Sequence, residues 1–450
     1  MVMVDQMARW VTDFDVAAIP EPVLEKARLH LLDSLGCALA ALDDPAALGV
    51  LHVAESLGGA PECTLIGSAV RTSVVNAVLA NGTLVRSLDL NDAAQHHGIA
   101  HPSDNIPVAL AVGERENATG RDVLGAIVLG YELLLRVPRS HLRPNPWDRT
   151  SHSSLAAAAM AGKLMRLPPG QLAEALALSV SHANVLSSVR RGQLSTAKSL
   201  ANSTVAQVAV ISALLASAGA TGPRTALEDW AEGAMGGADL SPLLAPQPAT
   251  HYRIMDCELK AHPCVIFAQT AVEAALQIYP QLNGHMITRV EARIADDPTM
   301  VTMTGDTDRG SPATKETADH SFSFVIAITL LEGELSLAQY EGQRWLDPTV
   351  RDLMGHITFT PDPSLNRHLP AYPIALRVTL DDGQAQEAEV PYAPGQLKRP
   401  MSPEEVSAKF HRFAAPHLPP DRRRAVIEAV SNLAQEIGRA SCRERVYVLV

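Results

Sequence analysis

Long Ala- and Leu-rich stretches, with apolar residues three and four positions apart, occupy the chain from residue 23 to about residue 244. This spacing places apolar side chains on one face of an α-helix, so it predicts that this half of the chain is an all-helical domain. Ala-rich faces of this kind allow helices to pack closely against one another. The clearest helices are expected at 23–42, 121–136, 154–166 and 204–216.

The character of the sequence changes beyond residue 267, where short β-prone runs appear among turn residues such as the Asp-Asp-Gly at 381–383. This change predicts a smaller α+β domain after the helical one. The apolar run 322–331 fits a helix packed under the sheet. Strands are expected at 287–294, 356–360 and 374–379.

The fold class that follows is α plus α+β, in three parts. We expect a large helical domain over 1–266, a smaller α+β domain inserted at 267–398, and C-terminal helices over 399–436 that return to the helical domain. The last part begins with Ser402 as an N-cap and Glu405 at the capping-box position, with proline in the first turn.

Composition excludes several classes of function. The 450 residues are 47% hydrophobic, and 37 Lys plus Arg against 49 Asp plus Glu give a formal charge of -12, the wrong sign for nucleic acid. The most apolar stretch, 205–216, is interrupted by Gln207 and Ser212, so no membrane crossing is expected. The first 14 residues carry three charges and do not resemble a signal peptide, which favours the cytoplasm.

The cysteines form no framework for disulfides or metal. They show no Cys-x-x-Cys pair, which is typical of reduced cytosolic thiols. An iron-sulfur site would need nearly all of them. They stand at positions 37, 63, 257, 264 and 442.

The end of the chain reads as foreign sequence. Residues 437–446, Ile-Gly-Arg-Ala-Ser-Cys-Arg-Glu-Arg-Val, match the translation of a common sequencing adapter residue for residue. The other interpretation is a basic solvated tail. We expect 437–450 to be an artefact, so neither Cys442 nor its basic neighbours are assigned a function.

A polar loop at residues 89–105 interrupts the apolar first half of the chain. Asp89 and His101 are its candidate acid-base pair, because a carboxylate can orient an imidazole that moves a proton. A helix cap followed by a solvated loop is the plainer alternative. Zinc or iron held by His96, His97, His101 and several Asp is another alternative, but their spacing fits no established ligand pattern. We therefore expect neither a metal nor a cofactor.

Two lysines stand in otherwise apolar surroundings. Lys198 precedes an apolar helix, and Lys260 lies in Leu-Lys-Ala-His-Pro at 259–263. Surface lysines with their stems against the protein would explain them simply. If they are buried, the cost of an unpaired ammonium implies an anionic ligand such as a polycarboxylate.

Several motifs together resemble the MmgE/PrpD family over nearly the whole chain. They are Leu-Asp-Leu-Asn-Asp at 88–92, His-Pro-Ser-Asp-Asn at 101–105 and Thr-Ala-Asp-His at 317–320, supported by Gly-Gln-Leu-Ser-Thr-Ala-Lys at 192–198 and Lys-Ala-His-Pro at 260–263. The family includes 2-methylcitrate dehydratases, cis-aconitate decarboxylases and an iminodisuccinate epimerase. The resemblance implies a helical domain, an α+β lid and a homodimer.

By motif position, the resemblance assigns catalytic roles to Asp89, His101, Lys198 and Lys260. The separation of 12 residues between Asp89 and His101 is closer to the dehydratase branch. Residues expected to bind substrate are Asn91, Ser103, Asp104, Arg149, His152, Arg191, His262 and His320.

The chain also departs from the family pattern. Ala93 stands where the family usually has Thr, Arg149 replaces a His, and Phe267 and Phe324 replace a His and an aromatic hydroxyl. Each change removes a hydrogen-bonding group, which bears on the substrate and on activity itself. His152 could replace the ring lost at Arg149.

These observations predict a lyase that binds a small di- or tricarboxylate at the domain interface. His101 would take the proton next to a carboxylate, and the cations would stabilise the developing charge. A 2-methylcitrate dehydratase-like hydro-lyase is the first hypothesis. A cis-aconitate decarboxylase-like reaction, an epimerisation, or a non-catalytic carboxylate-binding paralogue remain alternatives.

Overall fold

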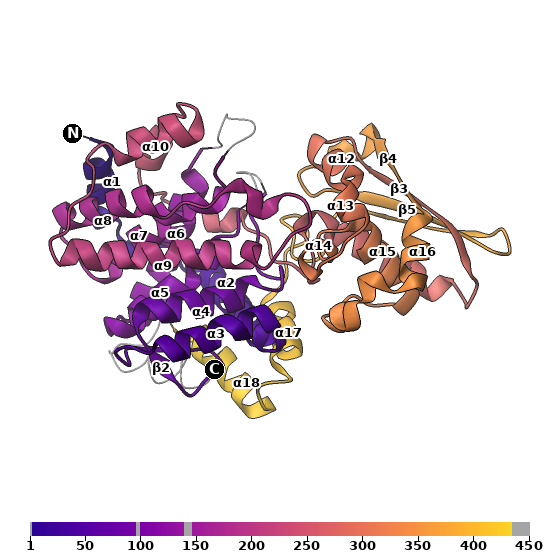
Figure 1. Ribbon diagram of the computed structural model, residues 1–450, viewed down its shortest axis with the longest axis horizontal. Helices are drawn as coiled ribbons and strands as arrows, with labels where there is room; N and C mark the ends of the chain where they lie inside the picture. Colours follow the sequence, from indigo (N-terminus) through magenta and orange to yellow (C-terminus); the bar gives the residue numbers. More distant parts are fainter. Residues whose placement is uncertain (1, 96–99, 139–145, 434–450) are drawn as a thin grey trace. The chain divides into compact units, whose positions relative to one another are not determined.

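A computed structural model describes residues 2–95, 100–138 and 146–433. These residues divide into two compact units, which Figure 1 shows in sequence colours. The helical unit comprises the described residues within 1–190, 199–257 and 402–433, and the mixed unit comprises Arg191–Lys198 and Glu258–Met401. The lid domain is predicted to start at 267 and end at 398, and the main segment of the mixed unit runs from 258 to 401.

The helical unit is built from helices and a short hairpin. The hairpin pairs β1 (Cys63–Thr64) with β2 (Arg71–Thr72) in antiparallel register, a feature that the sequence analysis did not predict. The helices are α1 (Met3–Asp13), α2 (Glu21–Ala40), α3 (Pro45–Leu57), α4 (Val74–Arg86), α5 (Ile106–Arg115), α6 (Gly120–Arg136), α7 (Ser153–Leu164), α8 (Pro169–His182), α9 (Ala197–Ser217), α10 (Ala226–Met235), α17 (Pro403–Ala414) and α18 (Pro420–Ser431).

Helices α2 and α6 are central to this unit. Helix α2 packs on α4, α6 and α17, and α6 packs on α5 and α7 as well. Helix α6 starts at a capping box in which the Thr119 and Asp122 side chains bond each other's backbone N–H groups. Most of both helices is buried, including polar residues such as His30 of α2 and Tyr131 of α6. These polar groups therefore need partners inside the protein.

Helix α9 is long and apolar enough, by length and composition, to cross a membrane. In the helical unit 61% of its most apolar window is buried, which is common for a core helix of a globular protein. It approaches α4 closely at Gly82, where a Cβ atom would come within 2.9 Å of the Ser203 Cβ. The hydroxyls of Thr83 and Ser203 lie 2.9 Å apart across the same contact.

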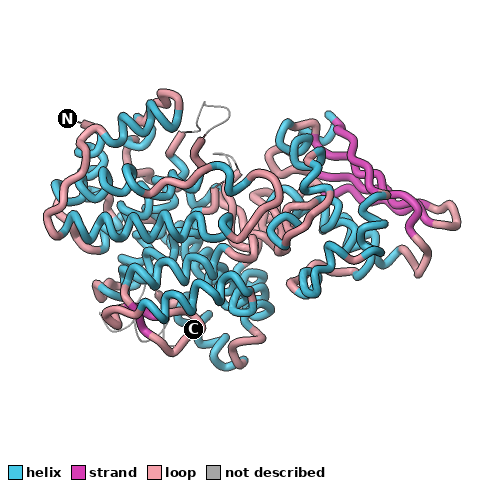
Figure 2. The backbone as a smooth tube through the Cα atoms, in the orientation of Figure 1, coloured by secondary structure: helices cyan, strands magenta, loops and turns pink. Residues whose placement is uncertain are grey.

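The mixed unit carries a sheet, drawn in magenta in Figure 2. In the described part of the chain this sheet has four strands in the order β4-β3-β5-β6, with β3 and β4 parallel and the other pairs antiparallel. Its elements are α11 (Gln269–Ile278), β3 (Ile287–Ala295), α12 (Pro298–Gly305), α13 (Thr307–Gly310), α14 (Lys315–Ala318), α15 (Phe322–Glu332), α16 (Pro348–Gly355), β4 (Ile357–Asp362), β5 (Ile374–Leu380) and β6 (Ala385–Val390).

Local chemistry explains the strand pairing in this unit. The predicted turn joins β5 to β6, and Gly383 has a positive φ of 82° that a glycine adopts at little cost. Helix α11 covers β5 and β6, and α15 packs on α11 and α16. The predicted strands and the helix over 322–331 are confirmed within a few residues, so the fold class is mostly helical with a small α+β part.

Residues 191–198 belong to the mixed unit, although the sequence places them in the helical domain. Hydrogen bonds explain this difference. The backbone N–H of Leu194 donates to the Thr317 hydroxyl at 2.8 Å, and the Thr314 hydroxyl donates to the Leu194 carbonyl at 2.8 Å. This segment therefore carries Lys198 on the same unit as Lys260.

The last segment starts at the predicted capping box. The side chains of Ser402 and Glu405 bond each other's backbone N–H groups, and α17 then packs on α2 of the helical unit. The described cysteines, Cys37, Cys63, Cys257 and Cys264, are buried and free of disulfides. The predicted artefact at 437–450, with Cys442, lies outside the described residues.

Candidate active site

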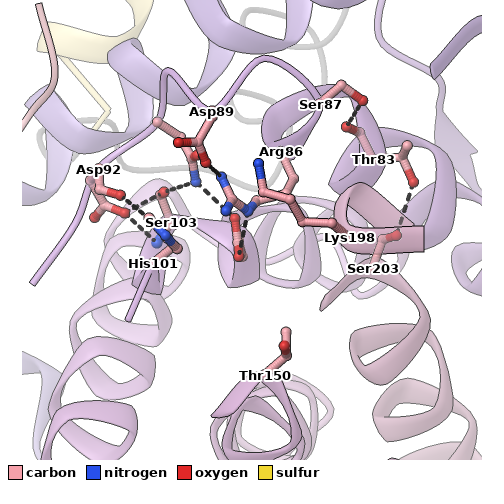
Figure 3. A network of polar contacts seen from close by, with 12 residues as sticks. Thr83, Arg86, Ser87, Asp89, Asp92, His101, Ser103, Thr150, Lys198 and Ser203 are labelled. Carbon is pink, nitrogen blue, oxygen red and sulfur yellow. Dashed lines mark hydrogen bonds and ion pairs between the residues drawn. The ribbon is translucent and has the colours of Figure 1, made fainter. Parts of the chain in front are cut away.

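The polar loop begins where α4 ends. Arg86, the last residue of α4, is almost completely buried and forms an ion pair with Asp89. Asp89 adopts a left-handed backbone conformation with φ of 49°, which Asp tolerates better than most residues. A buried, strained residue of this kind is often found at functional sites. Figure 3 shows the pair within a larger polar network.

Asn91 links this pair to the second half of the loop. Its oxygen accepts from Arg86 Nη1 at 3.3 Å, and its amide donates to the Ser103 hydroxyl at 2.9 Å and to Asp104 Oδ1 at 2.7 Å. Asn91, Ser103 and Asp104 are buried. Their predicted roles in substrate binding stay predictions, but the structure gives these polar groups partners inside the protein.

Asp92 is the most heavily bonded carboxylate of the loop. Its Oδ1 accepts the backbone N–H of Ser103 at 3.1 Å and the Ser103 hydroxyl at 2.5 Å. Its Oδ2 accepts the Tyr131 hydroxyl at 2.7 Å and lies 3.0 Å from His30 Nδ1. Burial alone would raise the pKa of Asp92, but the hydrogen bonds from His30, Ser103 and Tyr131 lower it below its usual value.

His101 is held by the backbone carbonyl of Asp92. Its Nδ1 lies 2.6 Å from the carbonyl oxygen of Asp92. Because a carbonyl oxygen can only accept, Nδ1 carries the proton, and Nε2 of the neutral ring keeps its lone pair. Pro102 favours an extended conformation for His101, so the short helix Pro102–Asn105 starts just after it. The ring is therefore oriented as a proton acceptor requires.

The predicted pairing of Asp89 with His101 stays a prediction, and the structure adds further partners for both residues. Asp89 bonds Arg86, and His101 is oriented by the Asp92 carbonyl. Both residues belong to one network on the helical unit, because Arg86 also bonds Asn91, which bonds Ser103. A direct catalytic role for each residue stays a prediction.

Helix α17 contacts the segment before Asp92 through Lys409. The Nζ atom of Lys409 donates to the Leu90 carbonyl at 3.0 Å and lies 2.6 Å from Asp33 Oδ1 of α2. Burial raises the pKa of Asp33, although the ammonium of Lys409 opposes this effect. Lys409 therefore ties α17 to α2 and to the segment that leads into Asp92.

Asp104 differs from its neighbours in its ionisation. Burial raises the pKa of Asp104 to about 6, although the charge of Arg86 opposes the shift. The nearest guanidinium atom, Arg86 Nε, lies 3.8 Å from Asp104 Oδ2. Asp104 therefore changes charge closer to neutral pH than Asp92 does.

The segment around Arg149 lies on the same unit. Arg149 and His152 bound a short helix whose N-cap, Asp148, bonds Thr150 and accepts Arg190 Nε at 2.9 Å. His152 is buried with its ring against Trp230 at 5.2 Å, and burial lowers its pKa to about 3. His152 is therefore neutral in the folded protein, so it does not supply a positive charge for a carboxylate.

The mixed unit holds the predicted lysines. Lys198 is buried, with its Nζ 3.5 Å from Asp319 Oδ1 and 3.4 Å from His320 Nδ1. His320 Nδ1 also bonds Asp319. This triad joins the start of α9 to the Thr-Ala-Asp-His motif, so two motifs far apart in the sequence meet on one unit. Arg191, at the start of the same segment, is exposed.

Lys260 is fully buried in a tightly bonded turn. Gln269 closes this turn, because its oxygen accepts the backbone N–H of His262 at 3.0 Å and its amide donates to the His262 carbonyl at 2.9 Å. His262 Nε2 lies 2.8 Å from Glu273. Burial would raise the pKa of Glu273, but His262 and Arg399 lower it. The predicted substrate contact of His262 stays a prediction.

The three apolar departures from the family pattern are buried. Phe267 packs edge-on against Tyr372 at 4.6 Å, and Phe324 lies 5.5 Å from the ring of Tyr340. The Tyr340 hydroxyl donates to the Pro263 carbonyl at 2.8 Å. Ala93 is fully buried. These side chains fill apolar space in the folded chain.

The alternative of a metal held by the histidines of the polar loop depends partly on residues that the structure does not describe. His96 and His97 lie outside the described residues. Elsewhere, His285, Asp381 and Asp382 bring possible ligand atoms within 4.8 Å of one another on an exposed surface. The two ring nitrogens of His285 face different carboxylates, at 2.9 Å from Asp381 and 3.7 Å from Asp382, an arrangement typical of exposed ion pairs.

Sequence reasoning missed the partners that hold the loop. Arg86, His30, Tyr131 and Lys409 come from helices whose apolar spacing hides single polar residues. A signal was present, because His30 and Asp33 fall in an otherwise apolar stretch, where a polar residue needs a partner.

Comparison with known proteins agrees with this architecture. The MmgE/PrpD N-terminal domain matches residues 5–240 and the MmgE/PrpD C-terminal domain matches residues 262–435. A 2-methylcitrate dehydratase of Cupriavidus necator is 28% identical, with 90% of this chain and 88% of that protein covered. The Escherichia coli K12 2-methylcitrate dehydratase is 27% identical over 87% and 85% of the two chains.

A second activity occurs among the similar proteins. The cis-aconitate decarboxylase of Homo sapiens is 24% identical, with 95% of this chain and 91% of that protein covered. Dehydratases and decarboxylases are both lyases.

Proposed function

Because the chain belongs to the MmgE/PrpD family, whose similar members are lyases, we propose that it is a hydro-lyase acting on a small di- or tricarboxylate of the 2-methylcitrate type. The observation that carries the proposal is the orientation of His101. Its Nδ1 is bonded to the Asp92 carbonyl, so Nε2 is the nitrogen that can accept a proton.

The proposed reaction begins at the carbon next to a carboxylate. His101 Nε2 takes the proton from this carbon, and negative charge develops on the adjacent carboxylate. The hydroxyl on the neighbouring carbon takes up a proton from solvent and leaves as water, while a carbon–carbon double bond forms and His101 afterwards returns its proton to solvent. Substrate and product then differ by one molecule of water, as a hydro-lyase requires.

Lys198 and Lys260 are proposed to bind the carboxylates of the substrate. Both lysine side chains are buried, and a buried ammonium beside a bound carboxylate compensates the charge of that carboxylate where water cannot. Asp319 and His320 already neighbour Lys198, so they hold its side chain in a defined orientation. Positive charge next to the developing carboxylate charge would stabilise the transition state.

Decarboxylation is the second candidate, favoured by the similarity to cis-aconitate decarboxylase over 95% of this chain. In that reaction a carboxylate leaves as carbon dioxide, and the resulting carbanion takes a proton. The same histidine and cations would serve both reactions, which makes product analysis the deciding experiment.

The experiment is incubation of the pure protein with 2-methylcitrate, citrate, cis-aconitate and iminodisuccinate, followed by NMR. We expect loss of water from 2-methylcitrate or citrate. Carbon dioxide release from cis-aconitate would instead establish the second candidate. An unchanged spectrum for all four substrates would refute both.

Variants then test the residue roles. His101→Gln keeps size and polarity but removes the proton acceptor, so we expect turnover to fall by about 10²–10⁴-fold. Lys198→Ala and Lys260→Ala should mainly raise KM if these groups bind ground state and transition state equally. A folded His101→Gln protein with most of its activity would refute the role of His101.

A further inference from the structure

A buried cluster beneath the polar loop connects α2 and α6 to His101. His30 and Tyr131 are fully buried, and their rings pack edge-on at 5.3 Å. Both meet the same carboxylate oxygen, Asp92 Oδ2, with His30 Nδ1 at 3.0 Å and the Tyr131 hydroxyl at 2.7 Å. This geometry fixes the position of the Asp92 side chain.

Asp92 holds the loop on both sides of the base. Its carbonyl oxygen accepts Nδ1–H of His101, and its carboxylate binds the N–H and hydroxyl of Ser103, two residues further on. Backbone hydrogen bonds between Ala94 and Ala100 close the segment between them. Any movement of Asp92 therefore moves the acceptor that selects the tautomer of His101.

The protonation states agree with this arrangement. A carboxylate only accepts, so both His30 Nδ1 and Tyr131 must donate. Burial lowers the pKa of His30 more than Asp92 raises it, so the ring is neutral with its proton on Nδ1. Burial also raises the pKa of Tyr131, which keeps its hydroxyl protonated. The other charged groups nearby are Lys26, Asp33 and Lys409.

We propose that His30 is a positioning residue for the general base, and that it acts through Asp92 to keep His101 in the Nδ1–H tautomer. This inference rests on the proposed function, since it takes His101 as the base. Residues that orient a functional imidazole through its other nitrogen are often as important as the imidazole itself. His30 has no direct part in the proton transfer.

A matched pair of variants tests the geometry. In Asn the amide nitrogen is attached to Cγ, as Nδ1 is in His, whereas in Gln it lies one carbon further out. His30→Asn should therefore keep the hydrogen bond to Asp92, and His30→Gln and His30→Leu should lose it. We expect kcat to fall about 10–100-fold in the Gln and Leu variants, with KM changed less than about twofold and His30→Asn restoring most of the loss.

A spectroscopic measurement makes the test independent of turnover. Proteins with ¹⁵N-labelled histidine give two-bond ¹H–¹⁵N correlations that report which ring nitrogen carries the proton. The His101 signals are identified by their absence from His101→Gln. We expect the Nδ1–H tautomer in the native protein and in His30→Asn, and a mixture of tautomers in His30→Gln and His30→Leu.

The outcomes separate the two proposals. If the native protein converts no substrate, the proposed function fails, while the tautomer of His101 still tests the positioning role. If His30→Gln keeps both the native kcat and the Nδ1–H signal, the positioning role is refuted. Should His30→Leu not fold, as judged by circular dichroism, the Asn and Gln variants decide the question, because equal kcat values in these two would also refute it.

Discussion

Two buried carboxylates of the polar loop, Asp92 and Asp104, ionise in opposite ways. Burial raises the pKa of both. Around Asp92, hydrogen bonds from His30, Ser103 and Tyr131 outweigh burial, and its pKa falls below the usual value. Around Asp104, a hydrogen bond from Asn91 and an Arg86 atom 3.8 Å away do not outweigh burial. The pKa of Asp104 therefore reaches about 6.

The difference shows that hydrogen-bond donors, more than burial, decide the charge of a carboxylate in this loop. The region around Asp92 is built to hold a fixed anion under the base. The region around Asp104 has a long ion pair to Arg86, and its carboxyl can change charge near neutral pH. Substitutions near Asp92 and substitutions near Asp104 should therefore change the free energy of unfolding by different amounts and with different pH dependence.

The largest effect is expected on the Asp104 side, for Arg86→Met. This change leaves the buried Asp89 and Asp104 without their shared counter-charge, and removal of one partner of a buried ion pair costs about 3–5 kcal/mol. Urea unfolding at pH 7 measures the loss.

The matched control is Arg115→Met, whose partners Glu62 and Glu116 are partly exposed. A surface pair of this kind contributes about 0–1 kcal/mol. Equal losses in Arg86→Met and Arg115→Met would contradict the assignment of Arg86 as the essential buried charge.

The next largest effect on stability is expected for His152, a buried histidine whose neighbour Asp148 does not offset the effect of burial on its pKa. The folded pKa of His152 is about 3, below the unfolded value of 6.5, so the stability it contributes is complete above pH 6.5 and is lost as pH falls toward 3. His152→Phe cannot take up a proton. Relative to the native protein it should therefore gain about 3 kcal/mol between pH 7 and pH 4, at about 1.4 kcal/mol per pH unit.

Unfolding free energies at pH 4 and pH 7 check this prediction. The control is His182→Phe, since His182 is exposed at the end of α8. The same relative gain in both variants would show that burial of His152 is not its cause.

A smaller change in stability is expected for Asp104→Asn, and its pH dependence is opposite to that of His152→Phe. The folded pKa of about 6 lies above the unfolded value of 3.8, so the native protein loses stability as pH rises between these values. The Asn variant does not ionise. Its stability relative to the native protein should rise by about 2 kcal/mol from pH 4 to pH 7, which is the part of the linkage between pKa 3.8 and about 6 that falls in this pH range.

Asp92→Asn sharpens the contrast. The folded pKa of Asp92 lies below 3.8, so its carboxylate contributes stability above pH 3.8 that is lost as pH falls through the folded pKa. The variant should be less stable than the native protein throughout pH 4–7. A gain in stability with rising pH in this variant would remove the difference between the two regions.

The sequence predicts the parts of the fold whose patterns are local. Helical spacing locates α2, α6 and α7, and the Asp-Asp-Gly turn locates the end of β5. Strand β6 is missed because its sequence, Ala-Gln-Glu-Ala-Glu-Val, is charged on alternate residues and lies at the edge of the sheet. Its pairing with β5 depends on a neighbour and not on its own hydrophobicity.

The candidate site divides in the same way. The contiguous loop is visible in sequence, because polar residues gather in an apolar protein. The partners that decide its ionisation, His30 and Tyr131, lie 62 and 39 positions from Asp92, so only the packing of α2 against α6 reveals them. Similarly, residues 191–198 join the mixed unit through hydrogen bonds to Thr314 and Thr317 that no local pattern encodes.

The smallest effect is expected for Tyr131→Phe, which removes one donor from Asp92 and leaves His30 and Ser103 in place. Loss of one hydrogen bond to a charged group costs about 1.5–3 kcal/mol, and the low end is expected here because two other donors remain and the apolar ring still fills its buried space. Because the pKa of Asp92 should rise toward its usual value, the loss should be greatest above pH 4 and should shrink in acid, as unfolding titrations at pH 3 and pH 7 would show. Tyr279→Phe, at an exposed position, is the control. A loss as large as that of Arg86→Met would mean that Tyr131 alone fixes the charge of Asp92, and no loss at all would mean that His30 and Ser103 suffice without it.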